Sequence, residues 1–137
     1  MSVAGSIDTC VALRVIVGDV PEQRAAALDL LGQGRFMLAN AAVAELVYGL
    51  TRWYGHSRQQ AAELTLAFMD QPSIKTTGVA KRAMVNYALH PKLSFEDCLI
   101  LQEALDSDAG SLWTFDRKLA NQTEARLLQA EGSADGE

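Results

Sequence analysis

The sequence predicts a three-layer α/β/α fold, in which helices cover both faces of a central parallel sheet. Short apolar segments alternate along the chain with longer segments that carry helix-start residues or helical apolar spacing. Parallel strands require long crossover connections, which are usually helices. The chain has 137 residues, of which 49% are hydrophobic and 21% are charged, and this length and composition suit one domain with its own core.

In the first half of the chain, the expected order is strand, two helices, strand and helix. The elements are a strand at Val3 to Ile7, helices at Thr9 to Val17 and Pro21 to Leu31, a strand at Phe36 to Ala39 and a helix capped by Asn40. Proline suits the first turn of a helix and asparagine is a good N-cap, which supports the last two helix starts. The final helix carries the i, i+3, i+4, i+7 spacing of a buried stripe in Val43, Leu46, Val47 and Leu50.

The second half of the chain continues the alternation and ends in a short tail. Its expected elements are a helix at Arg58 to Met69, a strand at Ile74 to Thr76, helices at Val79 to Leu89 and from Ser94 to about Asp108, a buried strand at Ser111 to Phe115 and a last strand at Ala125 to Leu128. One folded domain is therefore expected over residues 1–129. The acidic residues 130–137 have little to bury and are expected to be disordered.

Charge and residue usage exclude several classes of protein. The net charge of -5 gives no overall basic field to attract nucleic acid, although bound cations can offset a local cluster of carboxylates. Cys10 and Cys98 lack CxxC spacing and the N-terminus lacks signal-peptide features, so we expect a cytoplasmic protein with reduced, buried thiols. No apolar run approaches the ~18 residues of a membrane span. With only His56 and His90, a histidine-ligated zinc site is not expected.

Four acidic residues stand where a parallel sheet collects its ligands, in the crevice beyond the carboxyl ends of its strands. Asp8 directly follows the first expected strand, and Asp116 follows the strand that ends at Phe115. Glu45 lies about one turn into the helix after the second strand, on the side opposite its apolar stripe. Asp97 lies in the first turn of its helix. We expect all four side chains to converge at one edge of the sheet.

Converging carboxylates repel one another unless cations are bound between them. Hard divalent ions such as Mg²⁺ and Mn²⁺ prefer oxygen ligands, and Mg²⁺ commonly combines a few carboxylates with waters and phosphate oxygens. Ions held in this way promote phosphodiester hydrolysis without a catalytic histidine. The four acids therefore indicate a divalent metal site for phosphodiester chemistry.

Each acid taken alone also has a purely structural explanation. Asp97 closes the sequence Ser94-Phe95-Glu96-Asp97, which fits a capping box at a helix start. Glu45 alone is compatible with a solvated helix residue. Asp8 and Asp116 are compatible with turn or cap residues. Only the combination of all four, in this order, favours the metal site.

The order and spacing of four segments resemble PIN-domain proteins of the VapC-like type over about Ile7 to Leu119. The segments are Ile7-Asp8-Thr9-Cys10-Val11-Ala12-Leu13-Arg14, Ala44-Glu45-Leu46-Val47-Tyr48-Gly49-Leu50, Ser94-Phe95-Glu96-Asp97-Cys98-Leu99-Ile100 and Leu112-Trp113-Thr114-Phe115-Asp116-Arg117. The resemblance implies a Mg²⁺- or Mn²⁺-dependent endoribonuclease that acts on single-stranded RNA. It also implies a toxin with a cognate antitoxin, and we expect a homodimer.

The family's acidic quartet matches this chain residue by residue, and the resemblance assigns catalysis and metal binding to Asp8, Glu45, Asp97 and Asp116. Thr114 matches a hydroxyl residue two positions before the last acid. It shares a strand face with Asp116, so it either supports that carboxylate or only bonds to backbone. One departure is Cys10, where the family usually has Asn or Ser; a thiol is a poorer hydrogen-bond partner.

Residues outside the quartet have less specific interpretations. The basic residues near the motifs, which are Arg14, Arg52, Arg117 and Lys118, are expected either to contact an RNA backbone or to be solvated surface charge. Trp53 and Tyr54 follow the Glu45 helix and suit either core packing or a surface for a dimer or antitoxin, because aromatic residues are enriched at interfaces.

Two other functions stay open. The Cys10 departure and the acidic net charge favour a catalytically weak PIN-fold module that binds a protein or RNA partner. A phosphatase or phosphotransferase with an aspartyl nucleophile would suit Asp8 at a strand end. Such phosphatases usually carry a second aspartate nearby, and this sequence continues with Thr9 and Cys10 instead.

Overall fold

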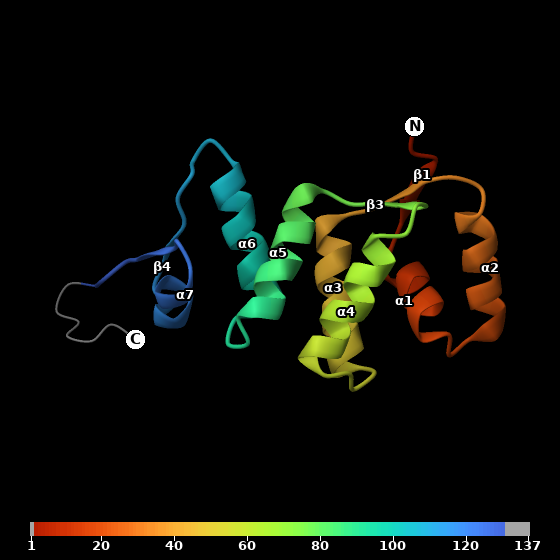
Figure 1. Cartoon of the computed structure of the whole chain (residues 1–137), viewed down its shortest axis with the longest axis horizontal. Coiled ribbons are helices and arrows are strands. Elements are labelled where there is room, and N and C mark those ends of the chain that lie inside the picture. The colour runs from red at the N-terminus through yellow and green to blue at the C-terminus, as the bar shows by residue number, and fades with distance from the viewer. Residues whose placement is uncertain (1, 131–137) are drawn as a thin grey trace.

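The computed structural model describes residues 2–130, and its first part is a parallel sheet connected by pairs of helices (Figure 1). The strands β1 (Gly5–Ile7), β2 (Phe36–Leu38) and β3 (Ile74–Lys75) form a sheet in the order β1-β2-β3. Both pairings are parallel, with Gly5 opposite Phe36 and Phe36 opposite Ile74. Helices α1 (Thr9–Val17) and α2 (Pro21–Leu31) connect β1 to β2, and α3 (Asn40–Arg52) and α4 (Arg58–Met69) connect β2 to β3.

Helices α1, α2 and α4 begin at the residues predicted from the sequence, whereas the start of α3 is shifted from its predicted cap. Asp8 accepts a hydrogen bond from the backbone of Val11 at the start of α1, and Ser57 and Gln60 form a capping box at the start of α4. Asn40, predicted to be the N-cap of α3, is instead its first helical residue. The cap position is Ala39, which offers no side-chain acceptor.

The core lies between the sheet and the helices. The predicted stripe of α3, Val43, Leu46, Val47 and Leu50, is buried. The same core contains Ile7, Phe36, Leu38 and Ile74, which alternate with more exposed residues along β1, β2 and β3. The first sheet therefore has one face that is strongly apolar.

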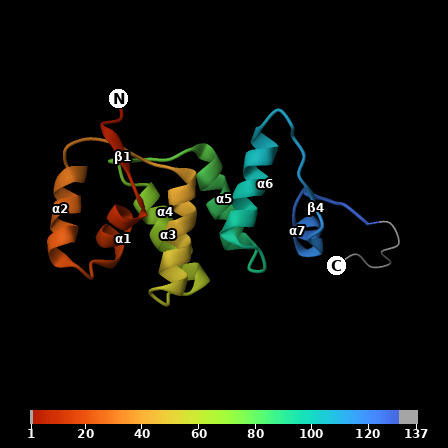
Figure 2. The same ribbon diagram turned by 180° about the vertical axis from the view of Figure 1, so that it is seen from behind.

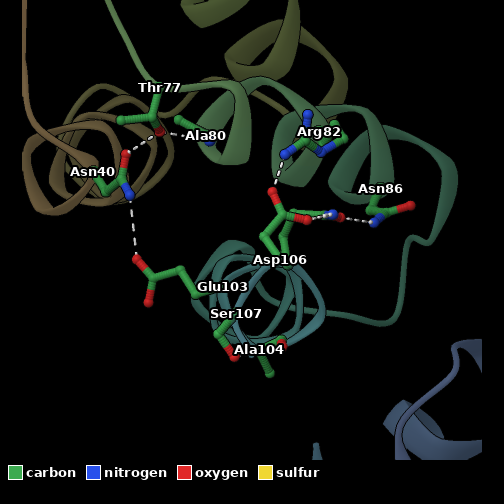
Figure 3. Close-up of polar contacts among 10 residues, drawn as sticks. Asn40, Thr77, Ala80, Arg82, Asn86, Glu103, Ala104, Asp106 and Ser107 are labelled. Atoms are coloured by element: carbon green, nitrogen blue, oxygen red, sulfur yellow. Dashed lines mark hydrogen bonds and ion pairs between the residues drawn. The ribbon is translucent and has the colours of Figure 1, made fainter. Parts of the chain in front are cut away.

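Helices α5 (Gly78–Leu89) and α6 (Phe95–Asp106) pack against each other and extend the body beyond β3 (Figure 1). Polar contacts fasten this pair to α3 (Figure 3). The Thr77 hydroxyl, which caps α5, donates to Asn40 Oδ1 at 2.7 Å, and Asn40 Nδ2 donates to Glu103 Oε2 at 3.2 Å. Arg82 of α5 pairs with Asp106 at the end of α6.

The last three elements form a separate unit, which we call the C-terminal unit. It consists of β4 (Trp113–Thr114), α7 (Arg117–Gln122) and β5 (Arg126–Leu127), and β4 and β5 make a second, two-stranded parallel sheet. These elements pack mainly on one another. In Figures 1 and 2 the unit lies at one end of the molecule, with α5 and α6 between it and the first sheet.

This arrangement corrects the expectation of a single sheet with a buried strand at Ser111 to Phe115. Trp113 and Phe115 are 56% and 60% exposed. The physical reason is the path of the linker of residues 107–112, which leads the chain away from β1 after α6 (Figure 1). In the part of the chain that the structure describes, β4 therefore pairs with β5 alone. An apolar pattern specifies which face of a strand seeks burial, but it does not specify the neighbouring strand.

The fold class is confirmed: parallel strands joined by helices fit the three-layer α/β/α architecture. Within residues 2–130, no helix is long and apolar enough to cross a membrane. The tail predicted at residues 130–137 lies, apart from its first residue, outside the described part of the chain.

Candidate active site

Asp8 lies at the carboxyl end of β1, where the chain turns into α1. Its backbone is extended and its Oδ1 accepts the N–H of Val11 at 3.2 Å, so the residue is the N-cap of α1. The side chain is exposed. One carboxylate oxygen thus holds the helix start, and the other accepts no hydrogen bond from residues 2–130. The cap function and a ligand function therefore use different oxygens.

Glu45 is held beside the start of α1 by Thr9. The Thr9 hydroxyl, on a residue that is only 6% exposed, lies 2.8 Å from Glu45 Oε1 and 3.2 Å from the carbonyl oxygen of Ala42. Because Thr9 directly follows Asp8, these contacts bring Glu45 of α3 next to the end of β1. Sequence reasoning did not single out Thr9. Its signal was a hydroxyl residue at the first position of a helix that begins at a candidate ligand.

Asp97 occupies the first turn of α6. Its backbone N–H donates to Ser94 Oγ at 3.0 Å, so Ser94 caps the helix as predicted. The neighbouring residues Ser94, Phe95 and Glu96 line a hollow of about 190 Å³ with Tyr48 and Arg52 of α3.

Cys98 is fully buried behind Asp97. Burial raises the pKa of its thiol from the ordinary 9.0 to about 11, with a further rise from the Asp97 charge and an opposing effect of Arg58. The prediction of a buried, protonated thiol is thus confirmed for Cys98. It is wrong for Cys10, which is exposed because it borders an open groove that is also lined by Arg14 of α1 and by Gln23 and Ala26 of α2.

Asp116 follows β4 in the C-terminal unit and resembles Asp8 in its local role. Its Oδ1 accepts the N–H groups of Lys118 and Leu119 at 2.9 and 3.3 Å, which makes it the N-cap of α7. Thr114 Oγ1 accepts the N–H of Asp116 at 2.9 Å. Thr114 therefore fixes the backbone of Asp116 and does not contact its carboxylate.

The four acids do not converge within one chain. In residues 2–130, no three histidine, cysteine, aspartate or glutamate side chains lie close enough together to hold a metal ion. Glu45 is bonded to Thr9, the residue that follows Asp8, whereas Asp116 belongs to the separate sheet of β4 and β5. The expectation of four acids at one sheet edge fails here because β4 does not join β1.

Comparison with known families decides the identity of the fold. The PIN domain family matches residues 6–124. The chain belongs to the PIN domain family. No curated protein and no solved structure was found to match it. PIN domains are generally metal-dependent nucleases, and the matched range includes all four acids.

The donor groups of this PIN domain suit a hard divalent cation. Asp8, Glu45 and Asp116 each use one carboxylate oxygen in a hydrogen bond within the protein, which leaves the second oxygen for a cation. Carboxylate oxygens are the ligands that Mg²⁺ and Mn²⁺ prefer. The chemistry of the residues therefore fits such an ion, and within one chain Thr9 holds Glu45 near the strand end that Asp8 follows.

A polar network lies on the side of α1 that faces α2. Arg14 contacts Asp19 at 3.1 Å, Tyr54 at 3.2 Å and Gln23 at 2.8 Å. The hydrogen bond with Tyr54 is the largest of the effects that raise the pKa of Arg14. Arg14 is thus committed to fixing the α1–α2 turn against the end of α3. Trp53, by contrast, is 63% exposed.

Proposed function

We propose that this PIN domain is a Mg²⁺- or Mn²⁺-dependent endoribonuclease that hydrolyses phosphodiester bonds in single-stranded RNA in the cytoplasm. In this proposal it is the VapC-like toxin of a toxin-antitoxin pair. The observation that carries the proposal is the placement of Glu45 by the buried Thr9 hydroxyl, next to Asp8 at the carboxyl end of β1. Family membership supports nuclease chemistry, and the specific substrate and biological role go beyond it.

In the proposed reaction, Asp8, Glu45, Asp97 and Asp116 would hold the cation once they are brought together, and the substrate phosphate would bind beside them. When bound, a divalent ion would supply activation of water and electrostatic stabilisation of the phosphate. Thr9 restricts the Glu45 side chain, so that less rotational entropy is lost when the site is filled. Thr114 acts indirectly, since it positions the backbone from which the Asp116 carboxylate extends.

The proposed antitoxin would cover the surface at the end of α3. Trp53 suits the role because it is exposed and packs edge-on against the half-exposed Tyr48, with ring centroids 6.0 Å apart. Tyr54 suits it less, because its hydroxyl is already bonded to Asp19 and Arg14.

The competing function is a catalytically weak PIN module that binds RNA or protein. Two observations favour it: Asp116 lies apart from Asp8 and Glu45 in a single chain, and Cys10 forms no hydrogen bond that would brace Asp8 within residues 2–130. Both functions predict RNA binding, so only cleavage distinguishes them.

The test is cleavage of a labelled, mixed-sequence single-stranded RNA by purified protein with Mg²⁺, with Mn²⁺ and with a chelator. We expect cleavage only with the metal ions. Asp8→Asn and Glu45→Gln should each lower the rate by about 100-fold or more, since even loss of outer-shell partners of a metal site commonly reduces activity 10- to 100-fold. Glu22→Gln, an exposed acid on α2, is the matched control and should leave the rate unchanged. Cleavage that survives the chelator, or RNA binding without cleavage, would reject the proposed nuclease.

A further inference from the structure

Two parallel sheets in this chain each end in an unpaired edge. In the described residues, β1 pairs only with β2, and β4 pairs only with β5. On β4, the carbonyl oxygens of Leu112 and Thr114 accept N–H groups of Arg126 and Leu128. By the alternation of a strand, the backbone groups of Trp113 and Phe115 point the other way, toward the unpaired edge. Such edges favour pairing with another strand.

The two sheets also match in their side-chain pattern. The apolar face of the first sheet includes Ile7 on the edge strand β1 and Phe36 on β2, and Gly5 lies beside Phe36 at the open edge. The second sheet exposes Trp113, Phe115 and Leu128. If Ser6 is opposite Thr114 in a parallel pair, Trp113 lies beside Gly5, which leaves room for the indole, and Phe115 lies beside Ile7. The exposed apolar residues would then extend the existing core.

The same register has a consequence for the acids. Asp8 directly follows β1, Asp116 lies two residues after the end of β4, and each caps the next helix. With Ser6 opposite Thr114, Asp8 is opposite Asp116, at the spacing of about 4.8 Å between neighbouring strands. Asp116 then lies at the edge of the sheet where Thr9 holds Glu45.

The chain's own C-terminal unit does not reach this edge in the structure. It lies at one end of the molecule, and α5 and α6 separate it from β1 in both views (Figures 1 and 2). A second copy of the chain offers the same unit and the same open β1 edge. Reciprocal exchange between two copies forms a closed, two-fold assembly, and exchange of an identical element is a low-cost way to build a dimer.

We propose that two copies of this chain exchange their C-terminal units, so that β4 of one copy pairs with β1 of the other and supplies Asp116 to its site. Each half then has a sheet of five strands, the three of one copy and the two of its partner. The catalytic part of this inference rests on the proposed nuclease function, and the exchange itself does not.

The first experiment is complementation between two inactive variants, Asp8→Asn and Asp116→Asn, which are co-expressed with different affinity tags and purified as the mixed dimer. In an exchanged mixed dimer, one site combines both substitutions, and the other contains Asp8 of one copy and Asp116 of the other. We expect about half of the wild-type activity per dimer, because one of two sites is intact. If each chain completed its own site, the mixture would stay as inactive as its parents, and the exchange would be overturned.

The second experiment does not depend on activity. In a Cys10→Ser background, one chain carries Ser6→Cys and the other carries Thr114→Cys. Neighbouring strand positions lie within the reach of a disulfide, so oxidation should give a covalent heterodimer. Ser107→Cys, which is exposed in the linker, replaces Thr114→Cys in the control and should give no such product.

The two experiments separate the failures of the two proposals. An inactive wild type that still forms the Ser6→Cys to Thr114→Cys heterodimer rejects the nuclease and keeps the exchange. An active wild type without complementation or cross-linking rejects the exchange and keeps the nuclease. A chain carrying both cysteines that cross-links only within itself, as a monomer, also overturns the exchange.

Discussion

Thr9 is the residue whose position says most about the site. Its hydroxyl is buried and lies between two acceptors, the carbonyl of Ala42 and the carboxylate of Glu45. A hydroxyl has one hydrogen to donate, so the two acceptors share it. The helix start that follows Asp8 therefore restrains a side chain from a different helix, and it does so without any charge of its own.

Removal of the Thr9 hydroxyl should weaken the site more than the fold. Thr9→Val keeps the shape of the side chain but leaves Glu45 without this donor, and we expect roughly 10-fold more Mg²⁺ to be needed for half-maximal RNA cleavage. Thr9→Ser keeps the donor and should restore the wild-type Mg²⁺ dependence. The measurement is cleavage rate against Mg²⁺ concentration, with circular dichroism melting to check the fold. A Thr9→Val protein with unchanged Mg²⁺ dependence would show that Thr9 is only structural.

Cys98 makes the stability of the protein depend on pH at alkaline values. Its pKa is about 11 in the folded chain, against an ordinary value of 9.0, so the folded state retains the thiol proton over this range. A raised pKa of this kind stabilises the fold fully below pH 9, and the stabilisation is lost as the pH rises from 9 to about 11. At pH 10.5 this loss amounts to roughly 2 kcal/mol.

Cys98→Ala should lack this dependence because it has no thiol to ionise. Urea unfolding of wild type and variant at pH 8 and pH 10.5 measures the effect. The stability advantage of the wild type should shrink by about 2 kcal/mol at the higher pH. An advantage that is constant with pH would contradict the assigned pKa.

At the scale of elements, Asn40 joins three helices by its side chain. It accepts from Thr77 at the cap of α5 and donates to Glu103 of α6, while its own backbone begins α3 (Figure 3). These contacts hold the α5 and α6 pair against the carboxyl end of β2. The amide group is well suited to this because it combines an acceptor with two donors.

Asn40→Ala should lower the free energy of unfolding by about 1 kcal/mol, since it removes two partly exposed side-chain hydrogen bonds. Asn121→Ala, on the exposed side of α7, is the same substitution in a helix without such contacts and should change stability by less than about 0.5 kcal/mol. Denaturant unfolding of both variants provides the comparison. Equal effects of the two substitutions would show that the Asn40 contacts contribute nothing.

Element bounds were predictable wherever local chemistry fixes them. Helix α4 and the pair α1 and α2 begin and end where caps, proline and glycine predict. Helix α7 was missed because its six residues carry too short an apolar pattern to recognise. The N-cap of α3 was misplaced by one residue, since Asn40 has a stronger intrinsic preference for the cap position than Ala39.

At the scale of the whole molecule, the sequence predicted the parallel α/β architecture but not how its strands assemble. Local spacing identified β4 and β5, and the apolar pattern at Ser111 to Phe115 predicted a buried strand in the same sheet as β1. Pairing between distant strands depends on the path of the linker after α6, which local patterns do not encode. For the same reason, the separate position of Asp116 could not be predicted from the sequence. The contact of Thr9 with Glu45 was predictable only in part.

The position of Asp116 also links the chemistry to the amount of protein in the cell. If each complete site requires residues from two copies, the number of complete sites at low abundance rises with the square of the protein concentration, because dimers form by mass action. If the protein is the proposed toxin, a few newly made molecules would then be nearly harmless, and the hazard to the cell would begin at a threshold. Dosage would thus restrain the proposed nuclease before any inhibitor is present.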